Sequence, residues 1–514
     1  MKKVVAFLTA LVLTISATGQ TLNVKVGSVT YQFPAAQAGE MSYQDGKTLT
    51  IMGKTFTLAD IDEMTIDDSS VKDNNVDIAY DGSSAQITVA GNVAQYVDAS
   101  VNKAHVSINQ TNTSDVDDEE ITYVMSGSSS DGSFSLDGSY KCTLQLAGLT
   151  LTNPSGAVID IANKKRIQLS VKKETENVLT DGAGGSQKGC IYSKGQLQLQ
   201  GNGTLTVKGK TAHAVKSGDY ITVKNLTLNI LSAVKDGISC NKYFQMKSGN
   251  VTISGVSDEG IQVELEEDDA STGETTDHED ENSANIYIEG GNLVVTASTE
   301  GIEAKGALTV TGGNVYAAGG DDGINSGGDM YLKGGYVFGR TTGTRTGADG
   351  FDANGNLYVQ GATVFGISHG NPDVAFDANS EGNKKLCLES GNLVAIGGVE
   401  SGASLTQTCS YTSSYSKGTW YGLYSGGTLV LAFQIPSTGT MGSNLIVSTA
   451  GTTELKKGIT VSDGTSIWNG LGYVDATVSG GSSVSLSTYT SSGGQGGGGG
   501  FPGGGGGGFP GGRW

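Results

Sequence analysis

The chain has 514 residues, of which 80 are glycine and six are proline, and charged residues make up only 16%. A glycine content this far above the usual ~7% excludes an ordinary helical enzyme, and the lack of a Gly-X-Y period excludes collagen. The formal charge of −20 repels nucleic acid and anionic lipid, so we expect no nucleic-acid partner and favour cations or neutral molecules.

Residues 1–19 have the pattern of a secretory signal peptide. Lys2 and Lys3 supply the charged start, residues 4–15 are apolar, and small residues precede Gln20. No later run of about 18 apolar residues exists, so no transmembrane segment is expected after signal removal. The sequence therefore predicts a protein that is secreted, periplasmic or on the cell surface.

Residues 20–115 contain short strand-like runs, such as 76–80 and 86–90, separated by Asp-Gly, Gly-Ser and Gly-Asn turns. This pattern predicts a small N-terminal β module.

A repeat of slightly more than twenty residues follows residue 158. Its marker is a small residue before an apolar one, as in KDGISCN (235–241) and ADGFDANG (348–355). Successive markers lie 24, 23, 23, 41, 22, 27 and 25 residues apart, and removing the acidic insertion 264–282 reduces the long interval to 22. Each marker precedes two short runs with apolar residues at every second position, such as Leu197/Leu199 and Leu205/Val207, and later Leu226/Leu228. Such coils must stack, because a single coil cannot bury its own apolar side.

The predicted fold class is therefore all-β, with a right-handed parallel β-helix (solenoid) over residues 116–399. The handedness follows the general rule for parallel crossovers. The run TWYGLYSGGTLVLAFQI (419–435) predicts a hairpin within a C-terminal antiparallel β module or cap over 400–480. The Gly-rich stretch 481–514 is expected to be a flexible tail.

The cysteines are widely spaced, unlike a disulfide scaffold or a zinc site. We expect buried small apolar residues, with one Cys387–Cys409 bridge as the alternative. The five are Cys142, Cys190, Cys240, Cys387 and Cys409.

Acidic residues recur around the marker glycines, so stacking would place them in columns about 4.7–4.9 Å apart. Like charges at this separation repel by about 1 kcal/mol per pair in water and by more where water is excluded. A Ca²⁺ ion between coils would remove this repulsion, because it accepts six to eight oxygen ligands with loose geometry. The candidate metal ligands are Asp236, Asp258, Glu259, Glu300, Glu303, Asp321, Asp322, Asp349, Asp352 and Asp377.

The alternative is that Asp-Gly serves only as turn chemistry and that the acids are solvated. Under the calcium hypothesis, the glycine after each acid is expected to adopt a positive φ. The insertion 264–282 is expected to be a solvated loop rather than a further metal site.

Aromatic residues occupy the outward positions of several coils. An exposed aromatic face can pack against a sugar ring, whereas cross-strand aromatic stacks also stabilise sheets without any ligand. Both interpretations stay open. The candidate carbohydrate-binding residues are Tyr287, Tyr316, Tyr331, Phe338, Tyr358 and Phe365.

Catalysis has little support, because the four histidines are scattered and no Gly-x-Ser-x-Gly or phosphate loop occurs. We therefore expect no catalytic residues and no enzyme. The enzymatic alternative is a calcium-dependent polysaccharide lyase, with a basic residue that removes a proton from a uronate ring. Lys305, Lys333, Arg340 and Arg345 lie nominally close to the acids.

The run KKRIQLSVKKETENVLTDG (164–182), followed by KGCIYSKGQLQLQGNGTLTV and AVKDGISCN, resembles the secreted β-helix family of carbohydrate-binding domain-containing proteins. The resemblance covers about residues 120–400. It implies a right-handed β-helix that binds calcium, cellulose and acidic sugars such as polygalacturonate, without demonstrated cleavage. Asp236, Asp258–Gly260, Asp321–Gly323 and Asp349 would then be calcium turns.

The expected function is an exported, calcium-binding protein that recognises polysaccharide, either cellulose or acidic glycans such as pectin, on the outer face of the β-helix. The other alternative is a surface adhesin whose solenoid is structural.

Overall fold

The computed structural model describes residues 19–38, 41–69, 72–265 and 281–491. Within these ranges the chain is all-β, as predicted, and contains no α-helix, only 3-10 turns such as η2 (Ala94–Tyr96), η4 (Ser380–Gly382) and η5 (Trp468–Gly470). No helix in the described ranges is long and apolar enough to cross a membrane. The predicted signal peptide and most of the acidic insertion and Gly-rich tail lie outside the described residues. The expectation of a flexible tail from residue 481 is wrong for its first residues, because Thr477–Ser483 and Ser487–Tyr489 are paired strands.

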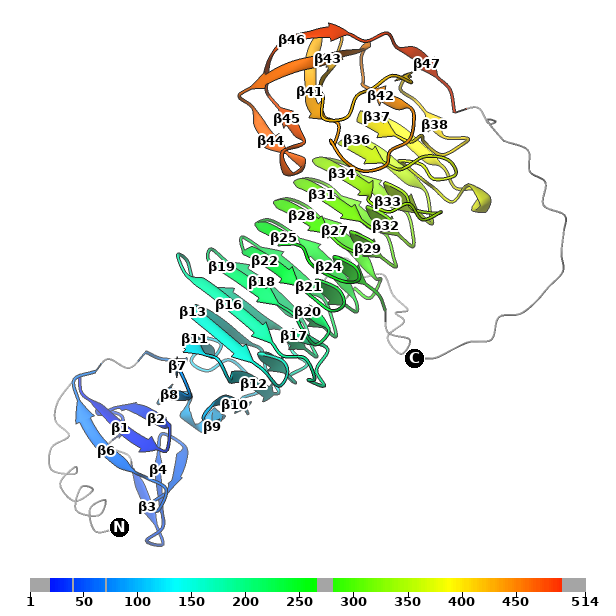
Figure 1. The fold of residues 1–514 in the computed structure, drawn as a ribbon. Helices are drawn as coiled ribbons and strands as arrows, with labels where there is room; N and C mark the ends of the chain where they lie inside the picture. The colour runs from blue at the N-terminus through cyan, green and yellow to red at the C-terminus, as the bar shows by residue number, and fades with distance from the viewer. Residues whose placement is uncertain (1–18, 39–40, 70–71, 266–280, 492–514) are drawn as a thin grey trace, which may run out of the picture.

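The centre of the molecule is a stack of coils, each of which contributes one strand to each of three parallel ladders (Figure 1). The first ladder follows β7 (Asn75–Asp81), β11 (Thr122–Ser129), β13 (Cys142–Asn153), β15 (Ile167–Val171), β18 (Leu197–Gly201), β21 (Ile221–Lys224), β24 (Tyr243–Met246), β27 (Asn285–Ile288), β30 (Leu308–Val310), β33 (Met330–Leu332), β36 (Leu357–Ile367) and β37 (Leu386–Ile396). The second leaves β13 through β16 (Glu176–Asp181), β19 (Thr204–Lys208), β22 (Thr227–Ser232), β25 (Asn250–Ile253), β28 (Asn292–Thr296), β31 (Asn314–Gly319) and β34 (Tyr336–Thr341), and joins the ends of β36 and β37.

The third ladder forms a separate sheet. It contains β10 (Ala104–Gln110), β12 (Gly132–Gly138), β14 (Ile159–Ile161), β17 (Gly189–Ser193), β20 (His213–Ser217), β23 (Ile238–Cys240), β26 (Ile261–Val263), β29 (Ile302–Ala304), β32 (Ile324–Ser326) and β35 (Phe351–Ala353), with β9 (Val97–Asn102) at its edge. The prediction of long parallel sheets is confirmed.

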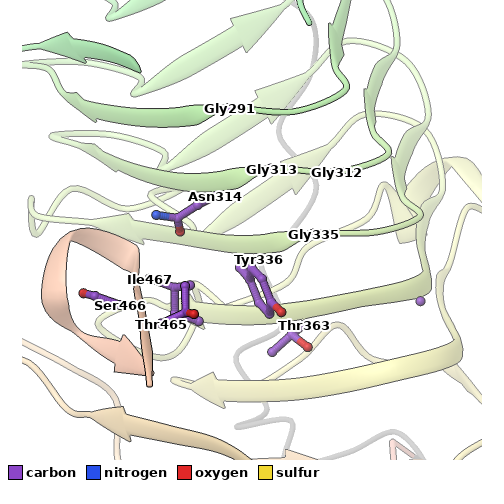
Figure 2. A pocket seen from close by; sticks show the side chains of 11 residues that line it. Gly291, Gly312, Gly313, Asn314, Gly335, Tyr336, Thr363, Thr465, Ser466 and Ile467 are labelled. Carbon is purple, nitrogen blue, oxygen red and sulfur yellow. The ribbon is translucent and has the colours of Figure 1, made fainter. Parts of the chain in front are cut away.

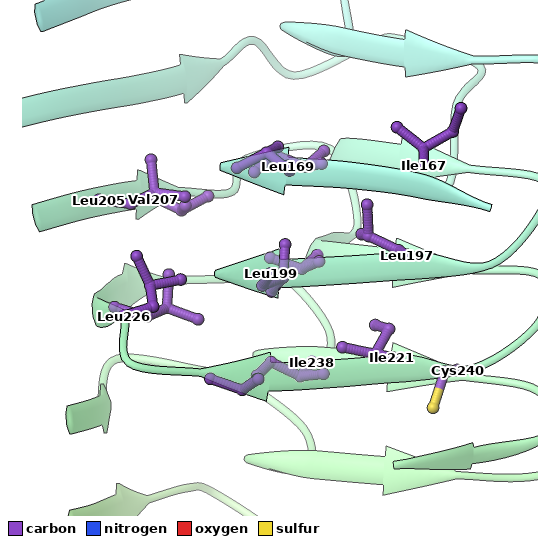
Figure 3. Close-up of a cluster of buried hydrophobic side chains, with 14 of the residues drawn as sticks. Ile167, Leu169, Leu197, Leu199, Leu205, Val207, Ile221, Leu226, Ile238 and Cys240 are labelled. Atoms are coloured by element: carbon purple, nitrogen blue, oxygen red, sulfur yellow. The ribbon is translucent and has the colours of Figure 1, made fainter. Parts of the chain in front are cut away.

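Apolar side chains at alternate positions fill the space between the ladders (Figure 3). Leu197 lies opposite Ile221, which lies opposite Phe244, and all three are buried. Complete burial of each such side chain is worth about 1.5–3 kcal/mol. In the second ladder Leu205 lies opposite Leu228, and Val207 lies opposite Ile230. The expected inward residues Leu226 and Leu228 are both buried, and Ile230 is buried with them.

The marker glycines are required by close packing between coils. A Cβ on Gly260 would lie 2.4 Å from the Gly301 carbonyl oxygen, and one on Gly301 would lie 2.4 Å from that of Gly323. The expectation of a positive φ at these markers is wrong, since none of them is among the positive-φ glycines. Glycine is needed because a side chain would collide with the backbone of the next coil.

The N-terminal strands belong to two sheets. β3 (Ser42–Gln44), β4 (Thr48–Ile51) and β5 (Lys54–Thr57) form a three-stranded antiparallel sheet. β1 (Thr21–Val26), β2 (Val29–Pro34), β6 (Glu63–Asp67) and β8 (Ser84–Ala90) join the sheet of β7, through the pairs β1–β2, β1–β6, β2–β8 and β7–β8. β7 pairs in parallel with β11, and β10 pairs in parallel with β12, so the ladders begin within residues 20–115.

The C-terminal segment forms a six-stranded antiparallel sheet beside the last coils (Figure 1). Its strands are β40 (Trp420–Ser425), β41 (Thr428–Gln434), β43 (Thr453–Ser462), β44 (Thr465–Ile467), β45 (Gly472–Val474) and β46 (Thr477–Ser483). The predicted hairpin is confirmed as the antiparallel pair β40–β41. The main sheet continues through β38 (Ser404–Leu405), β39 (Cys409–Thr412), β42 (Leu445–Ser448) and β47 (Ser487–Tyr489).

All five cysteines are free thiols, so the alternative Cys387–Cys409 bridge is not formed. Four are buried as expected, whereas Cys387 is half-buried because it lies on the outward side of the first ladder, opposite Tyr358.

Candidate functional site

The third ladder places polar side chains of successive coils opposite one another. Ser239 pairs with Gln262, Gln262 with Glu303, Glu303 with Asn325, and Asn325 with Asp352. The acids that precede the marker glycines lie beside this row and are unusually buried: Asp236 is 1% exposed and Asp322 is 3% exposed. The edge of the third ladder therefore carries carboxyl groups that are largely withdrawn from water.

Three of the predicted metal ligands form a compact cluster. Asp236, Asp258 and Glu259 each direct a carboxylate oxygen to a common point, and these oxygens lie within 4.8 Å of one another. His213 adjoins the cluster, because its Nδ1 lies 3.0 Å from Asp236 Oδ2. The repeat places His213 in one row with Asp236, because His213 precedes Ala214 as Asp236 precedes Gly237.

The electrostatics of this cluster favour a cation. Burial raises the pKa of Glu259 to about 9, and the neighbouring Asp236 carboxylate adds to the shift. Burial opposes ionisation of Asp236 as well, but its pKa is lowered because His213 and other hydrogen-bonding neighbours outweigh burial. Glu259 Oε2 is buried and has no hydrogen-bond partner among the described residues. Three carboxylates offer up to six oxygens, which fits the hard oxygen ligands that Ca²⁺ prefers.

Asp322 and Asp349 have a different role, because each accepts a hydrogen bond from the next coil. The Asp349 amide donates to Asp322 Oδ1 at 2.7 Å, and the Val374 amide donates to Asp349 Oδ1 at 2.6 Å. Burial raises the pKa of Asp322 to about 8 and that of Asp349 to about 7. These two acids therefore join coils directly, without a metal ion.

The negative charges of Glu303 and Asp321 are balanced by basic side chains. Lys305 forms an ion pair with Glu303, and Arg345 Nη1 lies 2.7 Å from Asp321 Oδ2. Glu300 is close to both acids and its pKa is raised, mainly by burial.

Asp352 and Asp377 complete the predicted ligand set at the last coils. Asn325 Nδ2 donates to Asp352 Oδ2 at 2.9 Å, and burial raises the pKa of Asp352 to about 6. Burial and the neighbouring Glu400 raise the pKa of Asp377 to about 9. Among the described residues, only the Asp236 cluster brings three acidic groups to one point.

The four basic residues considered for a lyase are engaged in ion pairs, in contact with an aromatic ring, or buried. Lys305 and Arg345 form the ion pairs described above, and Lys333 Nζ lies 4.9 Å from the centre of the Tyr331 ring. Arg340 is 8% exposed, and burial lowers the pKa of its guanidinium. The described structure therefore presents none of these four groups as a free base beside an open site.

The expectation that Phe338 and Phe365 face solvent is wrong. They point outward from the second ladder, as the alternation predicts, but the C-terminal module covers them and both are 0% exposed. The Phe365 ring lies 5.5 Å from Phe433 and 5.8 Å from Trp468, between ring centres. These rings hold the module on the coils and have no face for a sugar.

The tyrosines have limited open surface as well. Tyr331 and Tyr358 are stacked with ring centres 5.1 Å apart and planes 3° apart, so each covers a face of the other. Tyr316 stacks on Phe338 with centres 4.9 Å apart. The Tyr287 hydroxyl donates to Glu281 Oε1 at 2.6 Å, and burial raises its pKa. These contacts favour the structural interpretation of the aromatic rows.

A groove of about 530 Å³ opens where the coil corners meet the loop around β44, and Figure 2 shows its side chains. Its floor is bare backbone: Gly313 and Gly335 have φ of +88° and +76°, and a Cβ on Gly335 would lie 2.5 Å from the Gly313 carbonyl oxygen. Tyr336 and Thr363 stand on one side and residues 465–467 on the other. The groove thus combines a half-buried aromatic ring with hydroxyl and backbone polar groups.

The repeat pattern alone does not predict this groove. Tyr336 follows the Gly-Gly corner at the position where earlier coils have Asn292 and Asn314, and the three residues lie in one register row. That change from asparagine to tyrosine was a visible signal. The repeat gives no such signal for the opposite wall of the groove. That wall depends on contacts such as the hydrogen bond that the Trp468 amide donates to Asn314 Oδ1, and these two residues are 154 positions apart in the sequence.

A family model described as carbohydrate-binding domain-containing protein matches residues 104–278 and 278–407. The chain belongs to this family. A carbohydrate-binding domain-containing protein from Acetivibrio thermocellus is 30% identical over 119 residues, a match that covers 20% of this chain and 42% of the relative. The chain thus spans less than half the length of that relative.

A solved structure described as the polysaccharide lyase-like protein from C. thermocellum, a gadolinium derivative, is also similar to this chain. The match has a TM-score of 0.38 at 20% identity and covers 55% of this chain and 96% of that structure.

Proposed function

We propose that this chain is an exported, calcium-stabilised right-handed parallel β-helix that binds polysaccharide on its outer face. The observation that carries the proposal is the groove beside Tyr336, which belongs to a chain of the carbohydrate-binding family. Its volume of about 530 Å³ falls within the roughly 300–1,000 Å³ of ligand sites.

The groove suits an extended glycan. Its floor crosses the corners at Gly291, Gly313, Gly335 and Gly361, which belong to four successive coils. Three strand spacings amount to about 14 Å, so the floor is long enough for more than one sugar unit. A sugar ring can pack its C–H face on Tyr336, while its hydroxyls bond to Thr363, to the loop hydroxyls and to the glycine backbone.

Calcium would act on the coils through Asp236, Asp258 and Glu259. The buried, unpartnered Glu259 oxygen and the closeness of the three carboxylates support this assignment. An ion there would join successive coils and let Glu259 ionise. Acidic glycans such as pectin would gain a further contact if their carboxylates completed a calcium shell, and cellulose would not need one.

The test is affinity for immobilised cellulose and soluble polygalacturonate, with calcium or with EDTA. Tyr336→Ala is expected to weaken binding about tenfold, equivalent to about 1.4 kcal/mol. Tyr331→Ala is the matched control, because it removes the same side chain from a stacked pair outside the groove, and it is expected to bind like wild type. Equal affinity of wild type and Tyr336→Ala for both polymers contradicts the groove assignment.

The same experiment separates the alternatives. Release of unsaturated uronide from polygalacturonate would favour the calcium-dependent lyase. Failure to bind any polysaccharide would favour an adhesin with a structural solenoid.

A further inference from the structure

The C-terminal antiparallel sheet has two faces of different character. The Tyr421 and Phe433 side chains point toward the coils and are buried in the cluster around Phe338 and Phe365. Trp420 lies opposite Gln434, and Tyr473 lies opposite Ala432, so Trp420 and Tyr473 share the other face. Both rings are half-buried, and within the described residues neither belongs to the apolar cluster that joins this sheet to the coils.

These two rings border a second groove, of about 420 Å³, which is separate from the groove beside Tyr336. Its remaining walls come from β43 and the turn after it: Ile459, Thr460, Val461, Asp463 and Gly464. The volume again falls within the roughly 300–1,000 Å³ of small-ligand sites.

The ring geometry leaves aromatic surface available. The Trp420 and Tyr473 ring centres lie 5.5 Å apart with their planes tilted by 52°, whereas the stacked Tyr331 and Tyr358 planes differ by 3°. Parallel stacked rings cover each other's faces, whereas rings tilted against each other leave part of each face uncovered. An uncovered aromatic face at the border of a groove can pack against the C–H surface of a pyranose ring.

The polar groups in the groove select for a neutral ligand. Thr460 and Asp463 are exposed, and Asp463 forms no ion pair with another described residue. A free carboxylate accepts hydrogen bonds from sugar hydroxyls but repels a uronate. No lysine or arginine lines the groove in the described structure, and the net charge of −20 adds to the repulsion of anionic glycans.

We propose that Trp420 and Tyr473, with Asp463 and Thr460, form a second carbohydrate site that binds a neutral pyranose of a polysaccharide without calcium. The site goes beyond the proposed function of the coils, because it lies after residue 407, where the family match ends. It would give the chain two points of attachment to one polymer, and linked sites raise avidity well above either single affinity.

The test is calorimetric titration of the full chain with cellohexaose, mannohexaose and laminarihexaose in EDTA. At least one of these neutral probes is expected to bind, and Trp420→Ala and Tyr473→Ala are each expected to weaken that binding tenfold or more. Trp420→Phe is expected to keep most of the affinity, which separates loss of a contact from loss of the fold. Tyr43→Ala, which removes a tyrosine that is 51% exposed in the N-terminal segment, is the control and should bind like wild type.

The role of Asp463 in selecting a neutral ligand is tested separately. Asp463→Asn is expected to retain a weakened affinity for the neutral probe, and Asp463→Lys is expected to create calcium-independent binding of polygalacturonate. The proposal is overturned if no neutral probe binds in EDTA, or if the Trp420 and Tyr473 variants bind like wild type. The two grooves are told apart in the Tyr336→Ala background, in which the coil groove is weakened: the neutral-probe binding that remains in EDTA is expected to be lost when Trp420→Ala is added, and to persist when Tyr43→Ala is added.

Discussion

Replacing Glu259 by glutamine should change how the stability of the metal-free protein depends on pH. In the folded protein the pKa of Glu259 is about 9, against an ordinary value of 4.5. Between these two values the folded state holds a proton that the unfolded state has lost, so the free energy of unfolding falls as pH rises. The loss amounts to at most about 1.4 kcal/mol per pH unit, or about 4 kcal/mol between pH 5 and pH 8.

The neighbouring Asp236 does not cancel this effect. Its pKa is lowered, so the stability that it contributes is lost only when pH falls below its ordinary value of 3.8, outside this window. Glu259→Gln keeps the shape of the side chain but cannot ionise. In EDTA, the unfolding free energy of both proteins is compared at pH 5 and at pH 8. The fall between these two pH values is expected to be smaller in the variant than in wild type, by up to about 4 kcal/mol.

The assay is urea unfolding, followed by circular dichroism, at pH 5, 6.5 and 8 in EDTA. Glu454→Gln is the control, because Glu454 is exposed on β43, and its pH dependence should match wild type. Added Ca²⁺ should stabilise wild type at pH 8, by about 2.7 kcal/mol at a hundred times its dissociation constant, and stabilise Glu259→Gln less. Parallel pH profiles for wild type and Glu259→Gln would refute the reasoning.

Three further predictions concern the packing of the coils on one another and on the C-terminal module. Gly260→Ala should cost about 3 kcal/mol or more in unfolding free energy, because its Cβ would lie 2.1 Å from Val295 Cγ1 and 2.4 Å from the Gly301 carbonyl oxygen. The control Gly347→Ala has open space around its Cβ and a φ of +86°, so it should cost only about 1–2 kcal/mol. Similar urea midpoints for the two variants would contradict the coil-contact argument. Phe365→Ala should cost about 3–5 kcal/mol and expose the C-terminal module to limited proteolysis, and an unchanged cleavage pattern would argue against its burial under that module. Asp322→Ala should destabilise by about 1–3 kcal/mol even in excess calcium, since it leaves a backbone amide of the next coil unpaired, and full rescue by calcium would instead identify Asp322 as a metal ligand.

The acidic rows show how far repeat spacing can predict contacts. The repeat spacing puts Glu303 and Asp352 at equivalent positions, and the ladder pairs each of them with Asn325 between them. The period could not tell which acids share one point. Asp322 accepts a hydrogen bond from a backbone amide of the following coil. Asp236 and Glu259 instead form a cluster with Asp258, and His213 lies beside Asp236.

The sequence by itself determined the all-β class, the coil repeat, the alternation of inward and outward side chains and the C-terminal hairpin. These properties depend on local periodicity and on the residues tolerated at tight corners, and both are visible within a single repeat. Only the tertiary structure decided which outward residues meet solvent. Phe338 and Phe365 are covered, and Tyr336 borders a groove, because the C-terminal module, which is distant in the sequence, docks on the last coils. Docking of this kind depends on the shapes of two surfaces that exist only after both segments have folded. The residue spacing within either segment therefore does not predict it.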